Sequence, residues 1–157
     1  RPITFECKAI IPRTATEICT EIATVARWSE FKGYGVLPGI ANAHYEQKTS
    51  TMLGSRIRVQ NTDGSGHIEE IYAWKPGEKV SLKLHHFTPP LNRLASHFLE
   101  EWHFETAPHG TLVSRRFQLF AKRPVTRPFL WLISLLFKRA IARHLMQMRE
   151  ESKIVTA

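Results

Sequence analysis

Apolar and polar residues alternate with a period close to two through much of residues 40–121. This alternation predicts strands with one face toward a core and the other toward solvent. Turn-forming residues separate the strands, as at Asn61–Gly66 and Lys75–Glu78. A further strand is expected at Ile3–Ile11, because that run ends at Pro12. The pattern therefore predicts about six to seven strands, most of them joined as antiparallel hairpins.

Two segments follow a helical period instead. Thr14 or Thr16 can cap a short helix whose apolar positions continue to Trp28. After two Arg-Pro pairs have ended the sheet, a long helix is expected over residues 128–151, which contain no Gly and only one Pro, at their start. Strands and helices in separate runs indicate an α+β fold, and 157 residues with 43% hydrophobic composition fit a single domain over residues 1–157.

Several dispersed positions carry a resemblance to a known superfamily. They are Ile10-Ile11-Pro12 before the first helix, Trp28 at its end, Met52–Ser55 ahead of the third strand, Glu100–Glu105 and Gly110–Val113 in the last two strands, and the terminal helix. In these positions and in element order, the chain resembles the START-like superfamily, often called SRPBCC, which includes polyketide cyclases and lipid-transfer proteins. The resemblance implies a helix-grip fold, in which a curved antiparallel sheet wraps around the C-terminal helix, with one or two short helices after the first strand. None of the positions is a catalytic motif, so the resemblance concerns fold more than chemistry.

The resemblance also implies a cavity between the sheet and the terminal helix, and alternation selects the side chains expected to face it. The residues predicted to bind a ligand there are Tyr72, Trp74, Leu82, Leu84, His86, Trp102, Phe104, Phe117, Ile133, Phe137 and Ile141. The strand of Phe117 has two candidate faces, and the one shared with Val113 and Arg115 is preferred. Such a wall is typical of a pocket for a hydrophobic small molecule. The alternative is that the same aromatic side chains fill the core completely.

Two functions fit this cavity. The first is a non-enzymatic carrier or sensor for a lipid, a quinone or a polyketide-like ring. The second is a polyketide cyclase or dehydratase in which His86, Glu70 or Tyr72 transfers protons. The alternative for His86 is a structural histidine, hydrogen-bonded at the pocket rim. The sequence has no GxSxG, Walker or GxGxxG motif, and we expect neither a nucleophilic triad nor a cofactor.

Histidine is frequent enough to raise the question of a metal site. Five histidines lie within 25 residues: His85, His86, His97, His103 and His109. Adjacent residues on a strand point to opposite faces, and neither an HExxH nor a CxxC pattern occurs. We therefore expect no metal. The two cysteines, Cys7 and Cys19, are too few for a disulfide framework, which favours a reducing, cytoplasmic location.

The positive charge is concentrated at one end of the chain. The formal net charge is +8, and residues 122–149 contain seven basic residues and no acidic one. This localised charge, with few aromatic residues among the basic ones and no recognisable module, argues against nucleic-acid binding. The longest apolar run has nine residues, which is too short to span a membrane.

The first half of the terminal helix is apolar on every side. The residues outside its sheet-facing stripe are Phe129, Trp131, Leu132, Leu135 and Leu136. A helix of this kind is buried on both sides, so its far side is predicted to meet an anionic membrane surface or a second copy of the chain. The alternative is that loops at residues 31–39 and 88–99 cover it.

Overall fold

The computed structural model describes residues 1–156 and the side chains of residues 1–153. Its elements, in order, are β1 (Ile3–Ile11), α1 (Ala15–Ala23), η1 (Val25–Glu30), β2 (Ile40–Gln47), β3 (Arg56–Asn61), β4 (Gly66–Lys75), β5 (Lys79–His85), η2 (Leu91–Arg93), β6 (Ala95–Ala107), β7 (Gly110–Ala121), η3 (Pro124–Thr126) and α2 (Arg127–Thr156). The α+β character and the helix-grip arrangement expected from the sequence are confirmed.

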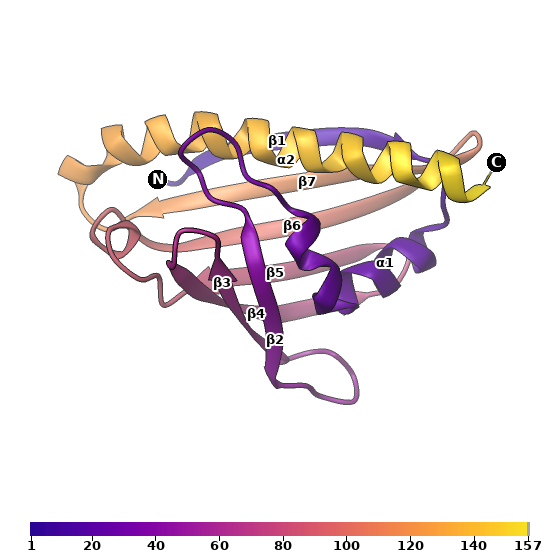
Figure 1. The fold of residues 1–157 in the computed structure, drawn as a ribbon, viewed down its shortest axis with the longest axis horizontal. Helices are drawn as coiled ribbons and strands as arrows, with labels where there is room; N and C mark the ends of the chain where they lie inside the picture. The colour runs from indigo at the N-terminus through magenta and orange to yellow at the C-terminus, as the bar shows by residue number, and fades with distance from the viewer. Residues whose placement is uncertain (157) are drawn as a thin grey trace.

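All seven strands form one antiparallel sheet. Their order is β1-β7-β6-β5-β4-β3-β2, so the first and last strands of the chain lie side by side at one end of the sheet. α2 lies along β1 and β7, whereas α1 and η1 lie nearer the other end (Figure 1). The loop between η1 and β2 reaches α2, where Arg139 donates a hydrogen bond to the Tyr34 hydroxyl over 3.2 Å. The curved sheet, α2 and this loop thus enclose an interior space.

The first helical region is shorter than its apolar pattern predicts. Thr14 caps α1, because its hydroxyl accepts a hydrogen bond from the Glu17 amide over 3.1 Å. The helix ends at Ala23, and a separate 3-10 segment, η1, continues to Glu30. The indole of Trp28 donates to the Ile22 carbonyl over 2.9 Å, which ties η1 back onto α1.

Two other element boundaries differ from the sequence expectation. β6 begins at Ala95, within a stretch that the irregular pattern predicts to be a loop. A register shift between Ala95 and His97 disturbs the alternation there, which explains the wrong prediction. α2 extends beyond the predicted residues 128–151 at both ends and has 30 residues. Within the described residues, no helix is long and apolar enough to cross a bilayer.

The core lies between the concave face of the sheet and one stripe of α2. The buried residues of that stripe are Leu130, Ser134, Phe137, Ala140, Ile141, Leu145, Met148 and Ser152. Phe137 contacts the rings of Phe5, Phe98 and Phe117, with centroid separations of 4.8 to 5.8 Å. Cys7 and Cys19 are both buried and free.

Candidate functional site: a cavity between the sheet and α2

A cavity of about 390 Å³ lies between the concave face of the sheet and α2. Side chains of α1, η1 and the loops around residues 31–39 and 88–94 complete its wall. Most of the lining is aliphatic or aromatic, and a volume of this size suits a small organic ligand. The aromatic residues of this fold therefore leave part of the interior open, and the alternative of a completely filled core is wrong.

Seven of the eleven residues predicted to bind a ligand line this cavity. They are Leu82, Leu84, Trp102 and Phe117 from the sheet, and Ile133, Phe137 and Ile141 from α2. The preferred face of β7 is also the inward one, since Val113, Phe117 and Leu119 are fully buried. Alternation in β5, β6 and β7 and the helical period in α2 predict these inward-facing residues correctly, because the elements are regular around the cavity.

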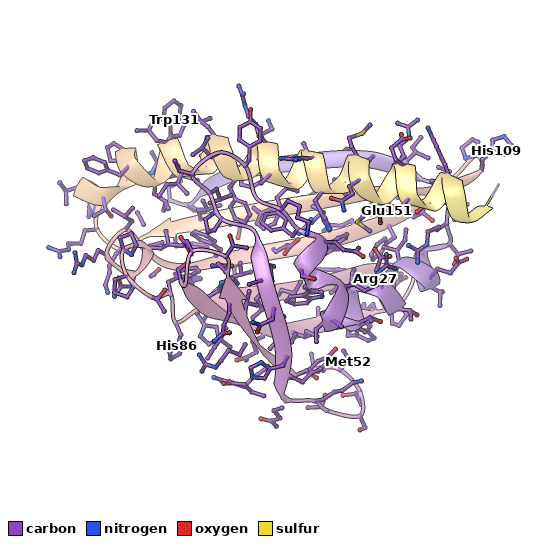
Figure 2. The ribbon with its side chains drawn as sticks, viewed as in Figure 1. Arg27, Met52, His86, His109, Trp131 and Glu151 are labelled. Carbon is purple, nitrogen blue, oxygen red and sulfur yellow. The ribbon has the colours of Figure 1, made fainter. Side chains whose placement is uncertain are left out.

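The remaining four predicted residues lie outside the cavity wall. Phe104 is buried in the core, where it stacks on Trp102 with a centroid separation of 6.4 Å. Trp74 packs against the core without reaching the cavity. Tyr72 is 43% exposed, and His86 is exposed just beyond the end of β5, far from α2 (Figure 2).

Irregular backbone explains the misplacement of Tyr72, Trp74 and His86. A register shift between Ile71 and Ala73 interrupts the alternation of β4, so Tyr72 and Trp74 do not share the face expected for them. His86 follows the last residue of β5 and has a positive φ of 56°, which ends the extended backbone. Neither feature is encoded in hydrophobic periodicity.

The three residues proposed for proton transfer are not brought together at the cavity. Glu70 lies on the opposite face of β4, with a carboxylate oxygen 3.4 Å from Arg56 Nη1 and 3.5 Å from His85 Nε2. Tyr72 and His86 also lie outside the cavity wall. The face of β4 that reaches the cavity carries His67 and Glu69, so the predicted face was wrong.

The cavity contains a buried polar cluster centred on Arg115. The guanidinium of Arg115, on β7, donates a hydrogen bond from Nε to Glu100 Oε2 of β6 over 2.7 Å, and its Nη2 lies 2.5 Å from the same oxygen in an ion pair. Its Nη1 lies 3.1 Å from His144 Nδ1 on α2. Both charged side chains are at least nine-tenths buried, and they connect the sheet to the helix across the cavity.

Burial shifts the protonation equilibria of two cluster members. Desolvation raises the pKa of Glu100 to about 7, and the nearby Glu69 carboxylate acts in the same direction, while Arg115 opposes both. Desolvation and the charge of Arg115 lower the pKa of His144 to about 3. Near neutral pH the cavity therefore contains a neutral imidazole and a carboxyl group that titrates.

A second acidic side chain completes the polar part of the wall. Glu69 of β4 is buried and lines the cavity, and its Oε2 lies 2.8 Å from Nε2 of His67. Among the described side chains, no three His, Cys, Asp or Glu residues are grouped closely enough to hold a metal ion. The polar cluster can thus donate, accept or transfer protons.

Part of this cluster was visible in the sequence. Glu100 shares the two-residue period of Trp102 and Phe104, and Arg115 lies between Val113 and Phe117 on the preferred face. His144 belongs to the apolar stripe of the terminal helix. A charged or polar residue within an otherwise apolar inward face is the signal in the sequence for such a cluster. Glu69 and His67 carry no such signal, because they lie on the face of β4 opposite to the predicted one.

Comparison with family models and with curated proteins finds no match to this sequence. Solved structures do match, at low sequence identity. The Zhui aromatase/cyclase from a Streptomyces species superimposes with a TM-score of 0.76 at 11% identity, over 100% of this chain and 97% of that one. A START superfamily protein from Mycobacterium smegmatis gives 0.72 at 12% identity, over 94% and 97%. This chain therefore has the START-like helix-grip fold.

The fold is shared by proteins of different kinds. A protein from Thermus thermophilus gives a TM-score of 0.72 at 12% identity, over 99% of both chains. The protein Ara h 8.0201 gives 0.60 at 15% identity, over 94% of this chain and 99% of that one. Identities this low establish the common fold, and the function has to be argued from the cavity.

Proposed function

We propose that this protein binds a hydrophobic small molecule in the cavity between its sheet and α2, as a carrier or sensor. One observation carries the proposal: the interior is open over about 390 Å³ and is lined mainly by apolar side chains, such as Leu82, Phe117 and Ile141. Transfer of apolar surface from water contributes roughly 25 cal/mol per Å², so a ligand that fills this space gains affinity without any covalent chemistry. A lipid, a quinone or a polyketide-like ring fits this description.

The direct test is to extract protein purified from cells with organic solvent, and to compare the extract with a native mass spectrum of the intact protein. A stoichiometric apolar compound supports the proposal and identifies the ligand class. Nile red, a neutral apolar dye, provides a second measurement when the protein is isolated empty. The dye is expected to bind with a blue-shifted emission.

Two neighbouring residues of α2 provide a matched pair of variants. Ile133 lines the cavity, whereas Leu132 is 56% exposed on the outer side of the helix. Ile133→Trp adds bulk inside the cavity and is expected to weaken Nile red binding at least about tenfold, which corresponds to about 1.4 kcal/mol. Leu132→Trp makes a comparable change outside and is expected to leave the affinity unchanged. Equal affinities in both variants would contradict binding in this cavity.

An enzymatic role is the second candidate, and the observation that favours it is the titration of Glu100. Three of the similar structures are aromatase/cyclases, and a carboxyl group with a pKa of about 7 inside the cavity is suited to proton transfer. Glu100 and His144 take the place of the three residues proposed from the sequence. In an enzyme, Glu100→Gln abolishes turnover of a ligand identified by extraction, whereas a carrier retains its binding and has no turnover to lose.

We also propose that the outer face of α2 docks on an anionic membrane surface. Phe129, Trp131, Leu132 and Leu135 are between 45% and 59% exposed, so the loops leave these four residues uncovered, whereas Leu136, predicted to lie with them, lines the cavity instead. Trp131 points away from the sheet (Figure 2). Exposed aromatic and aliphatic side chains beside a basic cluster are the usual composition of an interfacial helix.

Charge distinguishes the membrane from the other expected occupant, a second copy of the chain. Among the described residues, none of the seven basic side chains at positions 122–149 forms an ion pair. Exposed examples are Arg127, Lys138 and Arg143. A symmetric dimer through α2 would place this positive face against itself, whereas anionic lipid headgroups would neutralise it.

A further inference from the structure

We propose that the polar cluster of the cavity selects a ligand that carries an uncharged hydroxyl group, and that it rejects a ligand with a carboxylate. The inference rests on the proposed function and specifies the ligand class for the same cavity. It follows from the contacts that the buried guanidinium of Arg115 already makes within the protein. It also follows from the hydrogen-bond donors and acceptors that remain for a ligand.

Arg115 has little capacity left to bind an anion. Its Nε donates to Glu100, its Nη2 forms an ion pair with the same carboxylate oxygen, and its Nη1 contacts His144. One face of its guanidinium lies against Trp102, with Cζ 4.1 Å from the ring centroid. A bidentate pair with a ligand carboxylate requires a free edge of the guanidinium with two parallel N–H groups. The edge formed by Nε and Nη2 is occupied by Glu100, so the cation nearest to the ligand is already neutralised.

His144 supplies a donor for an uncharged group. A guanidinium can only donate hydrogen bonds, so His144 Nδ1 must be the acceptor in its contact with Arg115. The proton of the neutral imidazole is then on Nε2. His144 lines the cavity, and among the described residues Nε2 has no hydrogen-bond partner in the protein. This N–H is available to a ligand oxygen.

Acidic groups supply the matching acceptors. Glu69 and Glu100 are both buried in the cavity wall, and Arg115 is the only buried cation among the described residues that line it. A ligand hydroxyl can accept from His144 Nε2 and donate to one of these carboxylates. A ligand carboxylate can accept only, and it would add a third negative charge to a site with one buried positive charge.

Decanol and decanoate test this selection, because they differ only in the polar end of the same apolar chain. Their affinities are compared by Nile red displacement at pH 8, where decanoate is ionised. Decanol is expected to bind at least about tenfold more tightly, corresponding to about 1.4 kcal/mol. Decanoate binding as tightly as decanol would overturn the selection and leave the proposed function intact. If neither compound displaces the dye and the dye itself does not enter, the proposed function fails together with this inference.

Variants assign the effect to the cluster. Glu69→Gln removes a negative charge from the cavity and is expected to narrow the difference between decanol and decanoate. Glu105→Gln makes the same change at an exposed residue of β6 and is expected to leave the affinity difference between decanol and decanoate unchanged. His144→Phe is expected to weaken decanol binding more than it weakens Nile red binding. If the affinity difference between decanol and decanoate is the same in wild-type protein, Glu69→Gln and His144→Phe, the selection does not come from the polar cluster.

Discussion

Trp102 and Arg115 are direct partners across β6 and β7, and the guanidinium of Arg115 lies 4.1 Å from the centroid of the indole ring. The ring covers one face of the cation, and Glu100 holds the adjacent edge. Arg115 is thus fixed in one orientation by its neighbours on the sheet before α2 adds His144. This rigidity keeps the polar cluster in place in a cavity whose other walls are apolar.

The buried ion pair leads to a prediction about stability. Arg115→Met leaves the Glu100 carboxylate buried without its partner, and we expect the free energy of unfolding to fall by about 3–5 kcal/mol. The double variant Glu100→Leu, Arg115→Met removes both charges, so its loss is expected to be much smaller than the sum of the two single losses. Urea unfolding of wild type, Glu100→Leu, Arg115→Met and the double variant measures this coupling. Additive losses would show that the pair contributes no coupling energy.

The pKa of Glu100 predicts a pH dependence. Its pKa is raised to about 7 in the folded protein from an ordinary value near 4.5, so the folded state binds more protons between these values. The contribution of Glu100 to stability is therefore full below about pH 4.5 and is lost as the pH rises through 7. Glu100→Gln lacks this titration. The difference in unfolding free energy between wild type and Glu100→Gln is expected to decrease as the pH is raised from 5 to 8 in urea titrations.

His144 predicts the opposite trend. Its pKa is lowered to about 3 from an ordinary value near 6.5, so its contribution is full above pH 6.5 and is lost as the pH falls toward 3. The slope for one such group is at most about 1.4 kcal/mol per pH unit. His144→Gln retains an acceptor for Arg115 without titrating, and we expect it to lose less stability than wild type between pH 7 and 5. If the free energies of unfolding of wild type and His144→Gln change equally with pH, His144 is not held as a neutral imidazole in the folded protein.

Regular elements could be predicted from the sequence, and so could the part of the cavity that they form. Alternation in β5, β6 and β7 and the helical stripe of α2 place Leu84, Trp102, Phe117 and Phe137 on the cavity wall. These positions follow because one buried face fixes the register of a strand, and a slip by one residue would move its whole apolar set.

The polar chemistry of the cavity could not be predicted in the same way. The pairing of Glu100 with Arg115 depends on the register between β6 and β7, and the contact with His144 depends on how α2 crosses the sheet. Glu69, and not Glu70, faces inward beside Leu84, and the register shift between Ile71 and Ala73 breaks the alternation that would extend from Trp74 to these positions. Such shifts and long-range contacts arise from tertiary packing, which hydrophobic periodicity does not encode.

The outer face of α2 gives a final prediction about vesicle binding. Wild-type protein is expected to co-sediment with vesicles made of equal parts phosphatidylcholine and phosphatidylglycerol, and much less with phosphatidylcholine alone. Added salt is expected to weaken the binding, because it screens the attraction between basic side chains and lipid phosphates. Arg127→Glu with Arg143→Glu reverses two exposed charges of the basic cluster and is expected to reduce binding at least about tenfold, or about 1.4 kcal/mol.

A control variant separates the local charge from the net charge of the protein. Lys75→Glu with Lys83→Glu makes the same change in net charge at exposed positions on β4 and β5, away from α2. This variant is expected to bind vesicles nearly as well as wild type, whereas Trp131→Ser, which removes an exposed apolar anchor, is expected to bind less. Equal sedimentation of both charge-reversal variants would mean that α2 is not the docking face. A stable dimer in analytical ultracentrifugation that Trp131→Ser abolishes, without vesicle binding by wild type, would assign this face to a second copy of the chain instead.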